Sequence, residues 1–278
     1  MINRYFSPEN LKRFKQDFSF LIKITQTSLG EIDISIRDNY FNIYYRGNSL
    51  AKITFKKDNN YRIDIHTKFL SNTSAKNPKY YNKCIEKNNY FYIDLSKEQL
   101  HPFLQKKHIA QIATKIKVEN YSEELNFEQT LITDNINNNK IIFIDRQVTD
   151  SKLNRKRLDL LALKQISDNK YQFLIAEIKL GNNKELKDKV ALQLEEYIDH
   201  IKQNFILYKR CYEIQYKQKK NLGLIQRPNF ASIEIVEPVD GIVIVNGYSG
   251  IAKLQIKELK DKKTKLKIKH FTYRLTEI

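Results

Sequence analysis

The sequence is poor in residues that interrupt regular structure or cross-link a chain, since its 278 residues include 7 Gly, 5 Pro and 2 Cys. Trp is absent. Cys84 and Cys211 lie far apart and match neither a disulfide framework nor a metal-binding spacing. We therefore expect a reducing, cytoplasmic setting. The five histidines are scattered and form no H-x-x-x-H pair, which argues against a zinc site.

Long apolar segments are also missing. No run of about 20 apolar residues occurs, so no membrane span is expected. The opening stretch MINRYFSPENLKRFKQDF is charged throughout and has no apolar core, so no secretory signal is expected either. With 41% hydrophobic and 29% charged residues, the composition is that of a globular protein, and the length suits two domains.

Positive charge is present in excess. The chain has 49 Lys and Arg against 32 Asp and Glu, a formal net charge of +17. Such a surface attracts nucleic acid, because contacts between basic side chains and phosphates release counterions. The alternative is that the charge reflects the Lys, Asn and Ile bias that an AT-rich genome produces in any protein.

Residues 1–112 are expected to form a β-rich (α+β) domain. Ser7 followed by Pro8 predicts the start of a short helix. Alternating segments bounded by Asn, Asp or Gly then predict an antiparallel, half-buried sheet. Its aromatic residues are more typical of a core than of a base-stacking surface. This domain would recognise the substrate or a partner protein, or form a homodimer. The predicted strands are EIDISIRDN, YFNIYYRGN, AKITFKKDNN, YRIDIHTKFL and NYFYIDL.

Residues 113–278 are expected to form a second domain of α/β type. Helices are expected over about 97–117, across the boundary, and over about 121–135, at the start of this domain. IIFIDRQVT, RLDLLALKQ and YQFLIAEIKL predict three strands. A long helix or two is predicted from KELKDKVALQ onward, and PVDGIVIVNGY predicts another strand. The basic tail is expected to end in strands. Near-continuous apolar strands mixed with helices indicate a mixed sheet covered on both faces.

The segment FLIAEIKLG places an acid and a base on one face of a buried strand, because Glu177 and Lys179 are two residues apart. Asp159, in RLDLLAL, can lie beside Glu177 if the two strands are neighbours. Two carboxylates in apolar surroundings resist ionisation unless a positive charge lies between them. Mg²⁺, or Mn²⁺ in its place, bound through the two carboxylates meets that need. Lys179 can then orient a water or contact a phosphate.

This arrangement is suited to phosphodiester hydrolysis. The alternative is a buried ion pair that only holds the sheet together. The following helix supplies Gln193 and Tyr197, four residues apart and therefore on one helical face. Gln193 can hydrogen-bond a phosphate or a carboxylate, and Tyr197 can reach the nucleic acid, although such residues are more often surface or packing residues.

RLDLLAL, IAEIKLG and QLEEY together resemble the PD-(D/E)XK nuclease superfamily, most closely its RecB-type and archaeal-endonuclease-like branches, over about residues 120–250. The resemblance implies a restriction-endonuclease-like fold, with a mixed central sheet flanked by helices, and Mg²⁺-dependent cleavage of DNA. By position it also implies roles for single residues: metal ligands Asp159, Glu177 and the carbonyl of Ile178, the catalytic lysine Lys179, and the supporting helix residues Gln193 and Tyr197.

Further positions extend or depart from the motif. The family often adds an acid from the preceding helix, where Glu123, Glu124 and Glu128 are available and Glu128 is preferred as a further metal ligand. Such residues on a helix are by default solvated. Arg157 lies two residues before Asp159, at a position where many family members have a small residue. Its side chain would either crowd the site or contact a phosphate. Leu158 replaces the proline of the motif.

Two basic runs are candidate phosphate-binding surfaces. In KLNRKR, the side chains of Arg155, Lys156 and Arg157 would hold the DNA backbone. Residues 257–269, KELKDKKTKLKIK, look like a strand with one basic face, which is either a phosphate-binding or merely a solvated surface. Phosphate contacts position a duplex and do not read its bases.

The sequence therefore predicts a metal-dependent deoxyribonuclease, an endonuclease that acts in defence against foreign DNA or in repair. Whether RNA is also a substrate stays open. One alternative is a nucleic-acid-binding or assembly protein that keeps the fold without cutting, which the intact acid and lysine positions argue against. Another is a structural domain whose charge reflects codon bias alone.

Overall fold

The structure is a computed structural model that describes residues 2–70, 84–119, 122–150, 153 and 156–273. Its contacts divide the chain into two compact units. The N-terminal unit comprises Asn3–Gln129 and Lys217–Gln226, and the C-terminal unit comprises Met1–Ile2, Thr130–Tyr216 and Arg227–Ile278. The boundary expected between residues 112 and 113 falls inside helix α5 (Lys106–Glu119), before the division seen in the contacts.

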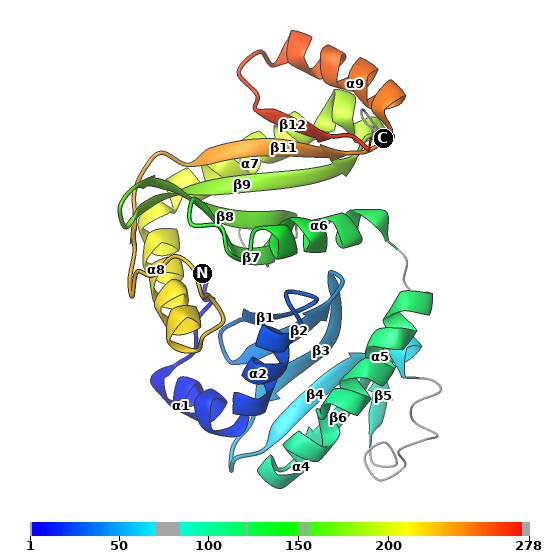
Figure 1. The fold of residues 1–278 in the computed structure, drawn as a ribbon, viewed down its shortest axis with the longest axis vertical. Coiled ribbons are helices and arrows are strands. Elements are labelled where there is room, and N and C mark those ends of the chain that lie inside the picture. Colours follow the sequence, from blue (N-terminus) through cyan, green and yellow to red (C-terminus); the bar gives the residue numbers. More distant parts are fainter. Residues whose placement is uncertain (1, 71–83, 120–121, 151–152, 154–155, 274–278) are drawn as a thin grey trace. The chain divides into compact units, whose positions relative to one another are not determined.

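The N-terminal unit is built on a six-stranded antiparallel sheet with the order β1-β2-β3-β4-β6-β5 (Figure 1). The predicted antiparallel, β-rich part is therefore confirmed. Strand β5 escaped prediction because all three of its residues are exposed and show no apolar alternation. The strands are β1 (Ile32–Ile36), β2 (Tyr40–Tyr45), β3 (Asn48–Phe55), β4 (Tyr61–His66), β5 (Ile85–Lys87) and β6 (Tyr90–Leu95).

Aromatic side chains form the core of this sheet and its helices. The rings of Phe14 and Phe18 contact Phe41 edge-on, with centroids 4.8 and 4.9 Å away. The first helix begins as predicted, since Ser7 Oγ accepts a hydrogen bond from the Asn10 N–H at 3.2 Å. The helical segments are α1 (Pro8–Asp17), α2 (Ser19–Thr27), η1 (Thr67–Phe69), α4 (Lys97–Phe103), α5 and α6 (Glu123–Asp134).

The C-terminal unit is built on a mixed sheet with the order β12-β11-β9-β8-β7, and β10 pairs with β9. Strands β7, β8 and β9 form an antiparallel meander, whereas β10 and β11 run parallel to β9, and β12 runs parallel to β11. The strands are β7 (Ile141–Thr149), β8 (Arg157–Ser167), β9 (Lys170–Leu180), β10 (Glu234–Ile235), β11 (Asp240–Asn246) and β12 (Ile268–Phe271). The predicted fold class, a mixed α/β sheet preceded by a β-rich part, is confirmed.

Helices accompany this sheet, and α7 runs along one of its faces (Figure 1). The predicted long helix is two helices that meet at Asn204. The basic tail contains strand β12, in line with the expectation that it ends in strands. The strand expected over residues 257–269 was wrong for its first part, because Ser249–Lys262 form a helix whose buried residues, Ala252 and Leu259, have helical spacing. None of the described helices combines the length and apolar character that crossing a membrane requires. The segments are η4 (Lys184–Lys187), α7 (Lys189–Gln203), α8 (Phe205–Asn221) and α9 (Ser249–Lys262).

Candidate active site

The register of β8 and β9 brings the two predicted acids together. Leu160 pairs with Ala176 in this antiparallel ladder, so the same register continued by one residue sets Asp159 opposite Glu177. Residues directly opposite each other on antiparallel strands project from the same face of the sheet. Asp159 also reaches across to the neighbouring strand, where its Oδ2 accepts a hydrogen bond from the Ile178 N–H at 2.9 Å.

Both carboxylates are poorly solvated. Glu177 is 2% exposed and Asp159 is 9% exposed. Burial raises the pKa of the Asp159 carboxyl, while the hydrogen bond from the Ile178 N–H and the charges of Lys179 and Arg157 oppose that rise. Because the raised pKa means that the charged form is disfavoured, an additional positive charge bound here would stabilise the carboxylate.

Lys179 places a cation beside Glu177. Its Nζ lies 2.9 Å from Glu177 Oε1 and 3.8 Å from Glu185 Oε2. Glu185 belongs to η4, which starts shortly after β9, and its N–H donates to Asn183 Oδ1 at 2.9 Å. Sequence reasoning missed Glu185. The only available signal was an acid that follows a Gly-Asn-Asn turn six residues after the lysine.

A glycine lets α7 lie directly against the face of the sheet that carries these residues. Gly241 of β11 pairs with Ile175, which shares the face of Glu177. A Cβ atom on Gly241 would lie 2.7 Å from Ile198 Cδ1 and 3.0 Å from Leu194 Cγ, both on α7. The missing side chain therefore permits the close approach that sets the position of the helix.

Tyr197 on α7 is buried, and its hydroxyl donates to the Arg157 carbonyl oxygen at 3.0 Å. Burial raises its pKa, and the negative charges of Glu177 and Asp159 add to the effect, which places the phenol in their field. The hydroxyl thus contacts the β8 backbone, and the expectation that Tyr197 reaches nucleic acid stays a prediction. One turn earlier, Gln193 Oε1 is buried and accepts no hydrogen bond from the described residues.

The predicted phosphate-binding residues have different surroundings. Arg155 lies outside the described residues. Lys156 is exposed, and its Nζ forms an ion pair with Glu196 Oε2 on α7. Arg157 is exposed and lies close enough for its charge to act on the Asp159 carboxyl. Of this run, Arg157 is the residue that the structure places beside the acids.

The acids of α6 belong to a different part of the chain. Glu128 is buried in the N-terminal unit, and Glu123 and Glu124 lie partly exposed in the first turn of the same helix. Within the described ranges, no three His, Cys, Asp or Glu side chains are grouped so that they could hold a metal ion. The role of Glu128 as a metal ligand therefore stays a prediction.

The donor set at Asp159 and Glu177 nevertheless suits a hard divalent cation. Mg²⁺ commonly takes only one or two protein carboxylates and completes its shell with water and substrate oxygens. Among the described residues, Asp159 uses Oδ2 alone for hydrogen bonding, which leaves Oδ1 for another ligand. The contribution of the Ile178 carbonyl stays a prediction.

Comparison with known proteins adds a single distant likeness. No family model matches the sequence, and no curated protein matches it. Among solved structures, the chain is similar to a repair endonuclease from Pyrococcus abyssi, with a TM-score of 0.29 and 15% identity over 87% of this chain and 77% of that chain. A likeness of this size carries no assignment of activity, so the function proposed below rests on the side chains of the site.

Proposed function

We propose that this chain is a metal-dependent nuclease that hydrolyses phosphodiester bonds of DNA. The observation that carries the proposal is the placement of Asp159, Glu177 and Lys179 on one buried face of the sheet, from two adjacent strands. Buried charged groups are a poor way to stabilise a fold, because apolar residues of similar volume often serve as well or better. A catalytic site gives these three side chains a role that stability alone does not.

Each side chain has a task in this proposal. Asp159 and Glu177 would hold Mg²⁺ or Mn²⁺ through their carboxylate oxygens, with Ile178 adding its carbonyl. When bound, the ion polarises the scissile phosphate and lowers the pKa of a water. Lys179, held by Glu177 and Glu185, presents an ammonium group beside these acids that can contact a phosphate oxygen or orient the attacking water.

Helix α7 and the basic residues at the start of β8 would complete the site. Gln193 brings an amide whose Oε1 is not yet used by the described residues, and Tyr197 fixes the start of β8 through its bond to the Arg157 carbonyl. The side chains of Lys156 and Arg157, with Arg155, would contact the DNA backbone, and Glu128 is the proposed further ligand. We propose an endonuclease of defence or repair, with the N-terminal unit recognising the substrate or a partner.

A cleavage assay tests this proposal. Supercoiled plasmid, linear duplex, single-stranded DNA and RNA are incubated with the full chain in Mg²⁺, Mn²⁺ or EDTA. The expected result is metal-dependent cleavage of DNA that falls by at least about a hundredfold in Glu177→Gln and Lys179→Met, since each removes a group that acts on the reacting phosphate. Circular dichroism shows whether both variants keep the fold.

The matched control is the pair of half-buried Lys115 and exposed Glu119 on α5, whose charged atoms lie 3.9 Å apart. Lys115→Met and Glu119→Gln make the same chemical changes outside the site and should leave cleavage unchanged. If folded site variants cleave as well as the wild type, the activity comes from elsewhere and the proposal fails.

Binding of DNA without cleavage is the second candidate. The 2.9 Å ion pair between Glu177 and Lys179 favours it, because this pair already neutralises one acid without a metal. In this case the chain would bind DNA in EDTA with an affinity that falls steeply as salt rises, and no metal would produce cleavage. Loss of binding at low salt would remove both candidates.

A further inference from the structure

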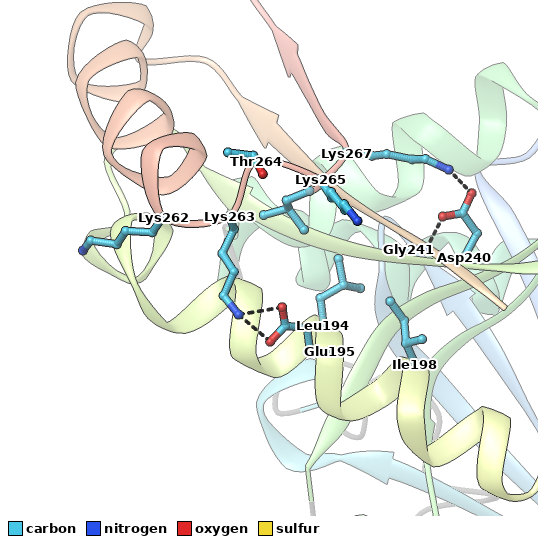
Figure 2. Close-up of a pocket in the computed structure, with 11 residues that line it drawn as sticks. Leu194, Glu195, Ile198, Asp240, Gly241, Lys262, Lys263, Thr264, Lys265 and Lys267 are labelled. Carbon is cyan, nitrogen blue, oxygen red and sulfur yellow. Dashed lines mark hydrogen bonds and ion pairs between the residues drawn. The ribbon is translucent and has the colours of Figure 1, made fainter.

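The C-terminal unit contains a pocket that is lined by none of the proposed metal-binding or catalytic residues. It has a volume of about 420 Å³ and lies between α7, the start of β11 and the segment that joins α9 to β12 (Figure 2). Pockets for small organic ligands fall in the range of about 300–1,000 Å³. The space is therefore large enough for a ligand well beyond the size of a simple ion.

One side of the pocket is apolar. Leu194 and Ile198 contribute their side chains from α7, and Leu266 contributes its own from the joining segment. Gly241 lies behind them and leaves α7 close to the sheet, because any Cβ there would lie within 3.0 Å of Leu194 and Ile198. These aliphatic groups form a surface that a flat or apolar part of a ligand can cover.

The joining segment also makes the rim of the pocket basic, and ion pairs hold it in place. Lys263 Nζ lies 2.8 and 2.9 Å from the two carboxylate oxygens of Glu195, and Lys267 forms an ion pair with Asp240 (Figure 2). The backbone adds further anchors, since the Val243 N–H donates to the Lys267 carbonyl at 2.9 Å. The segment between the two lysines is thus attached to α7 at one end and to β11 at the other.

Positive charge remains after these ion pairs are counted. Four lysines and two carboxylates line the pocket, which leaves a net charge of +2. Lys262 points away from the other labelled side chains and donates to the Lys187 carbonyl at 3.5 Å (Figure 2). Lys265, in the middle of the anchored segment, is exposed and makes no hydrogen bond or ion pair with the described residues.

We propose that this pocket binds a nucleotide, with the base against Leu194, Ile198 and Leu266 and the phosphate at Lys265. A purely inorganic anion would make no use of the aliphatic surface, and a purely apolar ligand would make no use of the lysine. A nucleotide joins both characters in one molecule. It can come from a free nucleotide or from one unit of a nucleic acid strand, and the net charge of +17 attracts either.

Isothermal titration calorimetry on the full chain in EDTA tests the proposal, and because no cleavage is needed, its outcome is independent of the proposed nuclease activity. The probes are dAMP, a 5′-phosphorylated single-stranded oligodeoxynucleotide, deoxyadenosine and inorganic phosphate. Binding of dAMP identifies the free nucleotide as the source, and binding of the oligonucleotide alone identifies a unit of a strand. If inorganic phosphate binds as tightly as dAMP and the oligonucleotide do, the apolar surface contributes nothing to binding and the proposal is overturned.

Variants of a single position locate the site. Lys265→Ala should weaken nucleotide binding about tenfold, the size expected for one hydrogen bond to a charged group, and Lys265→Arg should restore most of it. Lys257→Ala on the exposed surface of α9 removes the same charge outside the pocket and should have little effect. Equal losses in Lys265→Ala and Lys257→Ala, or no nucleotide binding by the wild type, would overturn the assignment.

Discussion

Lys179 Nζ lies 2.9 Å from Oε1 of Glu177, the residue two positions earlier on the same face of β9. Both side chains are less than 10% exposed, so each charge offsets the desolvation of the other. Asp159, on the neighbouring strand, adds a second buried carboxyl that this pair does not neutralise. The surplus of negative charge is what a bound divalent cation would balance.

The ion pair predicts strong coupling between its two residues. Glu177→Gln would remove the carboxylate that lies 2.9 Å from Lys179 Nζ, and Lys179→Met would leave the Glu177 and Asp159 carboxyls beside each other. Each change should lower the free energy of unfolding by about 3 kcal/mol, because it removes one partner of a buried ion pair. Urea denaturation at pH 7 in EDTA measures both. The double variant should lose clearly less than the sum, and strictly additive losses would contradict the coupling.

A bound metal should stabilise the folded chain. Because a ligand that binds only the native state raises stability by mass action, Mg²⁺ should raise the Tm of the wild type above its value in EDTA at equal ionic strength. Asp159→Asn and Glu177→Gln each remove a proposed ligand and should abolish the rise. Glu119→Gln, on the surface of α5, is the control and should keep it. The same rise in all four proteins would indicate a metal bound elsewhere.

The raised pKa of Asp159 predicts how stability depends on pH. Its folded pKa lies above the unfolded value of about 3.9, so the native state binds more protons between the two values. The contribution of this group to stability therefore falls as the pH rises through that window and stays low above it. Asp159→Asn should be more stable than the wild type at pH 7 in EDTA, with the difference shrinking toward pH 4. A difference that grows in acid would contradict this assignment.

The hydroxyl of Tyr197 should matter for position and not for proton transfer, since its pKa is raised. Tyr197→Phe removes the hydrogen bond to the Arg157 carbonyl and should cost about 1 kcal/mol of stability. Tyr216→Phe removes a comparable bond, to the Phe230 carbonyl at 2.9 Å, and is the matched control. Both should lower the urea midpoint similarly, but only Tyr197→Phe should slow cleavage, without altering its pH profile.

Gly241→Ala tests the packing of α7. The added methyl group would meet Ile198 Cδ1 at 2.7 Å, so the helix must move, at a cost of about 1–3 kcal/mol. Cleavage should fall as well, because α7 carries Gln193 and Tyr197. Gly250→Ala on α9 meets nothing within 4 Å and should instead stabilise by up to about 1 kcal/mol, since alanine is the better helix former. Loss of stability in both variants would point to a cause other than the contact with α7.

The core of the candidate site follows from local patterns. Alternation along a strand places Glu177 and Lys179 on one face wherever the strand lies. The short turn at Asp168 and Asn169 makes β8 and β9 antiparallel neighbours, and their apolar residues then define a register that sets Asp159 opposite Glu177. These features depend on residues close in sequence, so they can be predicted from the amino-acid sequence alone.

Other features depend on how the chain turns after β9 and on contacts between distant segments, neither of which local patterns encode. Glu185 joins Lys179 because η4 folds back beside the end of β9, and Tyr197 is buried because α7 packs against Gly241. The nucleotide pocket exists because Glu195 on α7 and Asp240 on β11 hold two lysines of a segment that looked like a strand with one basic face. In the sequence alone these lysines are indistinguishable from a solvated surface. The two long-range ion pairs hold their segment against α7 and β11, and this packing forms the pocket.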